Sequence, residues 1–155
     1  MLHGEIERLG LGRRATIALV ATNGRGFQEH GPAEGGAMHT PTTRVPLLIH
    51  MPGQTTSVRH SQPVGLVDVA PTLRELVGID VESDGVSLLP VLRGNEVEGA
   101  DRRVLYLESL EGYLRNGWAP LFAVVRGSLK YIDSPRPELY DLESDPNERR
   151  DLVAS

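Results

Sequence analysis

Two short apolar segments, separated by a long polar loop, constrain the fold of this chain most. Residues 15–21 read ATIALVA and residues 44–50 read RVPLLIH. Apolar runs of this length, rich in β-branched residues, are typical of strands covered on both faces, as in parallel sheets. We therefore expect residues 15–21 to be a buried strand of a parallel sheet and residues 44–50 to be a second buried strand. The loop between them, residues 22–43, is long for a compact domain, and loops of that kind are often functional.

A helical pattern follows these segments. Residues 66–79 carry apolar side chains at the spacing of one helix face. Asp68 is expected to be the N-cap, and Gly78 is expected to end the helix. A shorter helical turn is expected over residues 87–94. Strand and helix signals thus alternate in this part of the chain, which favours an α/β arrangement.

A polar stretch, residues 94–103, separates this part from a second one. Residues 138–154 are expected to form an extended piece, a turn at Asp145-Pro146 and a short C-terminal helix. Strands with a period of two are expected before it, at residues 104–110, 121–127 and 129–133. The predicted fold class is therefore α/β over residues 1–94, followed by a small antiparallel sheet plus C-terminal helix over residues 95–155.

Composition excludes several classes of function. The chain has 155 residues, 39% of them hydrophobic, and a net charge of −5, with Lys and Arg scattered along it. We expect no nucleic-acid partner, because no basic patch is present. No apolar run approaches the ~20 residues of a membrane span. The first residues lack the apolar segment of a signal peptide, and this leaves the compartment open. The chain has no cysteine, which excludes disulfides, thiolate metal sites and a cysteine nucleophile within it.

Three groups of motifs occur in a fixed order. They are ALVATNGRGFQEHG followed by TTRVPLLIHMPG, then VGLVDVAPTLRELVGI followed by DGVSLLP, then KYIDSPRPELYDLESDPNERRDL. In this order and spacing they resemble the C-terminal portion of the sulfatases, within the alkaline-phosphatase superfamily, from about Ala15 to Leu152. The resemblance implies part of an alkaline-phosphatase-like sheet with flanking helices and then a small antiparallel α+β subdomain. Most of the motif residues, such as Asp68 and residues 139–142, are scaffold in that family.

The resemblance also implies a chemistry that this chain carries only in part. Such sulfatases use a divalent cation, usually calcium, held by oxygen ligands, and a formylglycine nucleophile made from Cys or Ser in a C/S-x-P-x-R motif. No such motif is present. The nearest serine match, SQPVG at residues 61–65, lacks the final arginine. We therefore expect neither the nucleophile nor a bound cofactor in this chain by itself.

The metal-ligand motif of the family is altered. The family pattern is Asp-His-Gly or Asp-Asn-Gly, then Gly-Glu-His-Gly, and this chain has TNGR at residues 22–25 and QEHG at residues 28–31. Thr22 occupies the aspartate position, and its neutral hydroxyl is a poor ligand for a hard cation. Asn23 is either a remaining ligand through its amide oxygen or, with Gly24, a turn that tolerates positive φ. Arg25 would bring positive charge close to any cation.

The position of the sulfate-binding His or Lys is altered as well. Glu34 stands there, and a carboxylate repels a sulfate group. His39 lies close by in sequence and could compensate. His30 matches the Glu-His-Gly pattern, where it would organise the loop by hydrogen bonding or act as an acid or base. No catalytic residue is therefore intact by the family pattern, and His30 and His39 are the remaining candidates.

Two functional interpretations remain open at this point. The first is a sulfatase-family chain, a sulfuric ester hydrolase by resemblance, that is inactive by itself. It is either a pseudoenzyme that has lost its catalytic residues or a fragment that lacks an N-terminal half or a partner chain. The second is a non-catalytic binding or interaction module built on the same scaffold. A partial sheet leaves an exposed edge or apolar patch, and such surfaces need a partner.

Overall fold

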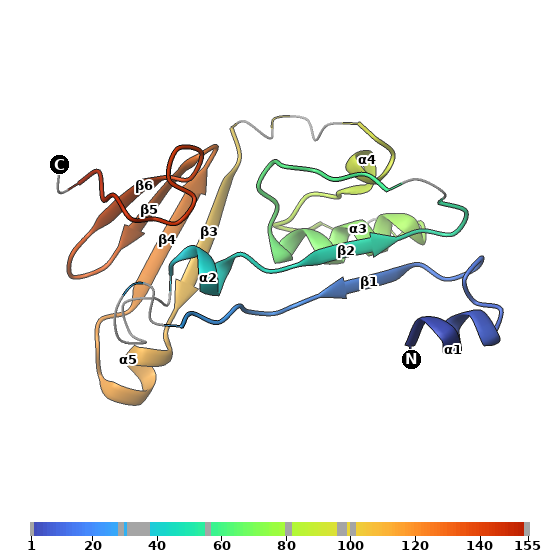
Figure 1. Ribbon diagram of the computed structural model, residues 1–155, viewed down its shortest axis with the longest axis horizontal. Helices are drawn as coiled ribbons and strands as arrows, with labels where there is room; N and C mark the ends of the chain where they lie inside the picture. The colour runs from blue at the N-terminus through green and yellow to red at the C-terminus, as the bar shows by residue number, and fades with distance from the viewer. Residues whose placement is uncertain are drawn as a thin grey trace.

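The computed structural model describes residues 2–27, 30, 38–54, 57–79, 82–95, 99 and 102–153. Two antiparallel sheets follow one another along the long axis of the molecule (Figure 1). The first is a two-stranded ribbon of β1 (Ile17–Val20) and β2 (Leu47–His50). The second has the strand order β3-β4-β5-β6, with β3 Val104–Ser109, β4 Leu121–Arg126, β5 Leu129–Asp133 and β6 Glu138–Asp141. No helix in the described part is long and apolar enough to cross a membrane.

The β1–β2 ribbon departs from the sequence prediction in direction and in burial. β1 and β2 pair with each other antiparallel, with Leu19 opposite Leu48, whereas residues 15–21 were expected to lie in a parallel sheet. The apolar content of a strand predicts its burial and carries no information on the direction of its neighbour. Leu19 and Leu48 are 60% and 58% exposed. Because directly paired residues share a face, this ribbon presents an uncovered apolar face.

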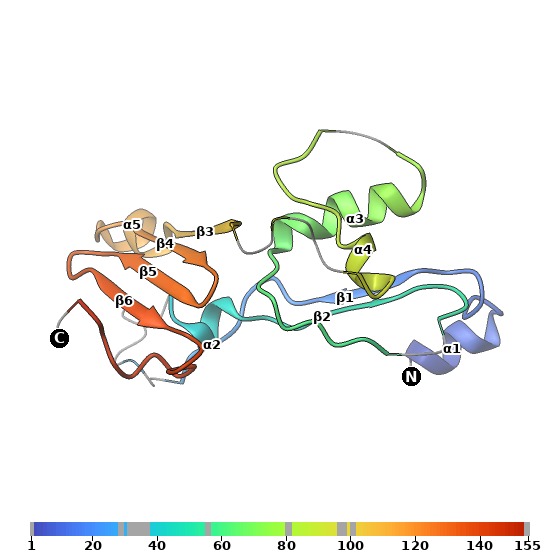
Figure 2. The ribbon, with the colours of Figure 1, turned by 90° about the horizontal axis from the view of Figure 1, so that it is seen from above.

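Helices are short and lie mainly beside the ribbon. Figure 2 shows α3 and α4 on one side of the β1–β2 ribbon. The helix predicted over residues 66–79 is confirmed as the 3-10 turn η1 and helix α3, which is followed by Gly78 at φ +74°. The helical segments are α1 Leu2–Arg8, α2 Thr40–Thr43, η1 Leu66–Asp68, α3 Val69–Leu76, α4 Leu89–Leu92 and α5 Glu111–Asn116.

Asp68 lies at the predicted N-cap position of α3, but its side chain has a different role. Its side chain makes no capping bond to α3. Instead the fully buried carboxylate accepts hydrogen bonds from the backbone N–H groups of Gly65 (2.7 Å) and Val86 (3.0 Å), and it forms a two-pronged ion pair with Arg103. Asp68 therefore ties three separate segments together, and this tertiary role overrides the local capping preference.

The four strands of the second sheet confirm the predicted strands, including the β4–β5 hairpin through Gly127 at φ +58°. Residues alternate along β5, so that Lys130 and Ile132 point to the buried face. The core here contains Met38, Ala123, Ile132 and Tyr140. Met38 lies in the part that we predicted to belong to the first unit, and the boundary near residues 94–95 stays a prediction.

The predicted C-terminal helix is wrong. Residues 142–153 contain turns and bends and no helix. They run beside β6 instead: the Leu139 N–H donates to the Asp151 carboxylate at 3.0 Å, and the Leu152 N–H donates to the Leu139 carbonyl at 2.8 Å. These bonds satisfy backbone groups at the edge of the sheet, which a helix over the same residues would leave open to solvent.

Candidate functional site

Thr22 and Asn23 lie just after β1, separated from it by Ala21, and are exposed. The Thr22 hydroxyl donates to the Asn23 amide oxygen at 3.2 Å, and the Asn23 amide nitrogen donates to the Gly24 carbonyl at 2.9 Å. The guanidinium of Arg25 lies 5.9 Å from the ring centre of Phe27. Within the described residues no group of three or more His, Asp or Glu side chains could hold a metal ion. The donors at the end of β1 are thus a hydroxyl and an amide beside a cation, which is a poor fit to calcium, a cation that prefers several carboxylate oxygens.

Gly24 is needed for a reason that the sequence did not suggest. Among the described residues, neither Asn23 nor Gly24 has a positive φ, so the expected left-handed turn does not form. Gly24 instead passes against α2. A Cβ at this position would lie 2.1 Å from the Pro41 carbonyl oxygen, and the Gly24 N–H donates to the Thr42 carbonyl at 2.8 Å. The glycine therefore permits a close backbone approach.

Replacing Gly24 with alanine is expected to lower the free energy of unfolding by about 1–3 kcal/mol, because the new methyl overlaps a backbone oxygen that cannot move independently. Urea denaturation measures the change. Gly4→Ala in α1 is the matched control, since a Cβ there meets no atom within 4 Å. That control is expected to gain about 0.5–1 kcal/mol from helix propensity. Equal effects of the two substitutions would contradict the close approach.

His30 and His39 come together in the structure. Their rings stack with centroids 3.9 Å apart and 10° between the ring planes. His39 is 3% exposed, and its Nε2 lies 2.9 Å from a Glu138 carboxylate oxygen. Its Nδ1 is buried without a hydrogen-bond partner among the described residues. Both imidazoles therefore lie against the four-stranded sheet, and their assignment as acid, base or sulfate donor stays a prediction. Glu34, the other candidate, lies outside the described residues.

Beside this histidine pair lies a buried charged network that the sequence interpretation assigned only to scaffold. Lys130 Nζ lies 2.7 Å from a carboxylate oxygen of Glu148, and these side chains are 1% and 0% exposed. The second Glu148 oxygen lies 4.0 Å from His30 Nε2. Burial lowers the pKa of the Lys130 ammonium, and the neighbouring carboxylates of Glu148 and Glu138 partly oppose this. One sequence signal was present: Lys130 shares a strand face with Ile132, and a lysine that points inward needs a carboxylate partner.

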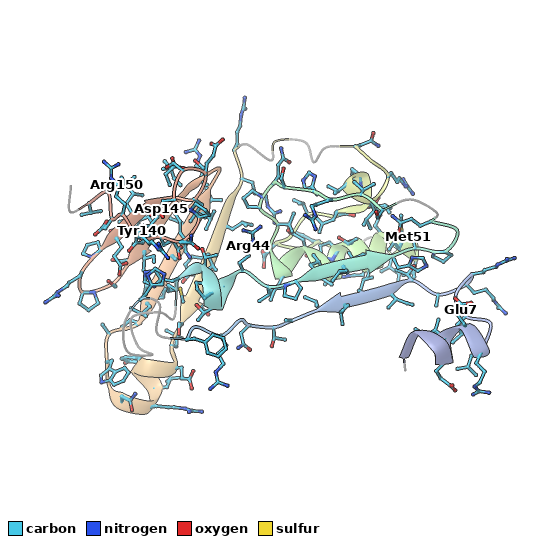
Figure 3. All side chains as sticks on the ribbon, in the orientation of Figure 1. Glu7, Arg44, Met51, Tyr140, Asp145 and Arg150 are labelled. Atoms are coloured by element: carbon cyan, nitrogen blue, oxygen red, sulfur yellow. The ribbon has the colours of Figure 1, made fainter. Side chains whose placement is uncertain are left out.

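Tyr140 completes the network, and it lies within the four-stranded sheet (Figure 3). Its hydroxyl donates to the same Glu138 carboxylate that contacts His39. Burial raises the pKa of this phenol, and the hydrogen bond to Glu138 and the charge of that carboxylate raise it further. Glu138 therefore has two partners, one from the loop before α2 and one from its own strand.

The raised pKa of Tyr140 predicts a loss of stability at alkaline pH. An unfolded tyrosine ionises near pH 10, so the contribution of Tyr140 is complete below about pH 10 and is lost as pH rises towards the higher pKa of the folded state. By about pH 11 the wild-type chain is expected to lose roughly 1 kcal/mol more than Tyr140→Phe, measured by urea denaturation from about pH 9 upwards. The lowered pKa of Lys130 acts in the opposite direction, because it makes stability rise with pH. This contribution is present in both chains, so it cancels when their stabilities are compared. Parallel pH curves would contradict the assignment.

Comparison with known proteins decides the family. Residues 28–155 match the family described as N-sulphoglucosamine sulphohydrolase, C-terminal. The chain belongs to the sulfatase family. It is 39% identical over 119 residues to choline-sulfatase of Rhizobium meliloti (strain 1021), covering 72% of this chain, and 30% identical over 159 residues to arylsulfatase K of Bos taurus, covering 96%. The predicted C-terminal sulfatase resemblance is confirmed.

The solved structures confirm the fold class. The crystal structure of Ps i-CgsB in complex with k-i-k-neocarrahexaose superposes on 99% of this sulfatase-family chain with a TM-score of 0.78 and 24% identity. This chain spans 22% of the length of the choline-sulfatase, 29% of arylsulfatase K and 35% of the Ps i-CgsB chain.

Proposed function

We propose that this chain is the C-terminal portion of a sulfatase-type hydrolase and that it does not hydrolyse sulfate esters by itself. The donor set at the end of β1 carries the proposal: Thr22 offers a hydroxyl where the family has a carboxylate, and that hydroxyl is bonded to Asn23. Charge builds up on the sulfate oxygens during hydrolysis, and cationic or donor groups must stabilise it. The nucleophile motif of the family is absent from this sequence.

In this proposal a further α/β unit, in the same chain or in a partner, covers the β1–β2 ribbon and supplies the missing groups. The exposed pair Leu19 and Leu48 supports it, because a two-stranded sheet with an uncovered apolar face is only marginally stable in water. The substrate class of the completed unit would be sulfate esters.

A turnover assay tests the catalytic part of the proposal. The purified chain is incubated with 4-nitrophenyl sulfate in calcium chloride, beside a complete sulfatase as the positive control. No release of nitrophenol above the uncatalysed rate is expected, and calcium is expected to leave the melting temperature unchanged. Turnover that scales with the concentration of the chain, and that a chelator abolishes, would contradict the proposal.

The exposed ribbon also supports the second candidate function, a non-catalytic interaction module. In that case the apolar ribbon face would be the binding surface, and the free chain would associate with itself through it. Light scattering after size-exclusion chromatography is expected to show a lower apparent mass for Leu48→Lys. Leu114→Lys is the control, because Leu114 is 75% exposed on α5, which lies away from the ribbon (Figure 1). Equal masses for the two variants would argue against this function.

A further inference from the structure

The four-stranded sheet holds α2 at both of its ends. A Glu148 carboxylate oxygen accepts a hydrogen bond from the backbone N–H of Thr40, the first residue of α2, at 2.5 Å. Lys130 donates to the hydroxyl of Thr43, its last residue, at 3.3 Å. Because Lys130 and Glu148 also pair with each other, one buried ion pair fixes both ends of this short helix. Figures 1 and 2 both place α2 against the sheet.

The helix α2 in turn contacts the segment that follows β1. The Gly24 N–H donates to the Thr42 carbonyl at 2.8 Å, and the Gly24 backbone lies close to the Pro41 carbonyl. Asn23 extends this set of contacts, because its side-chain amide donates to the Gly24 carbonyl at 2.9 Å. A continuous path therefore runs from the ion pair through the backbone of α2 and then through hydrogen bonds to residues 22–24.

Several features make the sheet end of this path rigid. Lys130 lies on β5 between backbone ladders to β4 and β6. Met38, two residues before α2, packs into the core of the same sheet. Glu148 has φ +53°, a conformation that non-glycine residues rarely adopt, within a turn closed by the bond from its N–H to the Asp145 carbonyl. A sparsely populated backbone conformation persists only where the surrounding structure fixes it.

We propose that Lys130 and Glu148 are positioning residues that hold residues 22–24, through α2, at the place where the sulfatase site is assembled. The inference rests on the proposed function, because it takes the end of β1 to be the ligand position. It gives the C-terminal KYI and DPNE motifs a role in setting site geometry across a sequence separation of 108 residues. Neither residue needs to touch a substrate in this role.

Amide hydrogen exchange followed by NMR tests this with two double variants of the whole chain. Lys130→Met/Glu148→Leu removes both charges and the acceptor for Thr40. Lys130→Met/Glu148→Gln removes the same charges and keeps an acceptor oxygen. Replacing a buried ion pair with apolar residues of similar volume is often neutral for stability, so both variants are expected to fold.

In the leucine variant, the amides of Thr40 and Gly24 are expected to exchange at least about tenfold faster than in the glutamine variant, while Val125 in β4 exchanges equally in both. Unchanged exchange at Gly24 would overturn the proposal, because α2 would then not transmit its position to the site segment. Equal acceleration at Gly24 and Val125 would also overturn it, since the pair would then act only on global stability. The exchange rates do not depend on turnover, so failure of the proposed function is detected separately by the 4-nitrophenyl sulfate assay.

Discussion

Replacing Asp68 with alanine is expected to lower the free energy of unfolding by about 3–5 kcal/mol. The substitution leaves Arg103 without its carboxylate, and it leaves the N–H groups of Gly65 and Val86 without an acceptor. Each unsatisfied buried donor costs on the order of 1–3 kcal/mol. Since a domain of this kind is stable by about 5–15 kcal/mol in total, the variant should lie near the limit of folding. Urea denaturation followed by circular dichroism measures the loss.

Asp84→Ala is the matched control for this substitution. Asp84 lies in the connection between α3 and α4, close to Val86 in sequence, and its side chain is exposed. Exposed substitutions of this kind usually change stability by less than about 0.5 kcal/mol. A loss below about 1 kcal/mol for Asp68→Ala would mean that the three segments around Asp68 are held by other contacts.

Replacing Ile132 with alanine is the second large expected effect, a loss of about 2–5 kcal/mol. Ile132 is 2% exposed and packs in one cluster with Met38, Ala123 and Tyr140, so the substitution opens a cavity at the centre of the four-stranded sheet. Met38 precedes α2, and part of the cost should therefore appear as faster exchange of the α2 amides. Denaturation and amide exchange on the same sample separate the global from the local effect.

Leu129→Ala on the same strand controls for the loss of an aliphatic side chain. Leu129 is 49% exposed and points to the opposite face of β5. We expect it to cost less than about 1 kcal/mol, because the residue already contacts water. Similar losses for Ile132→Ala and Leu129→Ala would place the core of this sheet elsewhere.

Local sequence patterns predicted much of this fold. The alternation of apolar residues located β3, β4 and β5, and the helical spacing located α3, because in each case the pattern reflects a face that packs against the rest of the chain. The predicted C-terminal helix is wrong because a local pattern does not include contacts with the edge of a sheet. Their turn and charge pattern is compatible with a helix, and only the free edge of β6, which exists once β6 has paired with β5, makes pairing with Leu139 the better solution.

The candidate site could be predicted only in part. The motif at residues 22–25 follows the end of β1, and three of its residues, Thr22, Asn23 and Arg25, are exposed. The sequence gives no indication that His39 lies beside Glu138, because the two residues are 99 positions apart and neither lies in a local motif with the other. Asp68 shows the same limit, since its partner Arg103 is 35 residues away. Long-range pairs of buried charges depend on the whole fold, and local propensity does not encode them.

The distance along the chain between Thr40 and Glu148 has a consequence for biosynthesis. The acceptor for the first N–H of α2 is made 108 residues after its donor. At a translation rate of about 5–20 residues per second, this leaves α2 without its anchor for roughly 5–20 seconds on the ribosome. During that interval His30 and His39 lack Glu148 and Glu138, the carboxylates that they contact in the folded chain. A residue that is made 108 positions later thus anchors the start of α2.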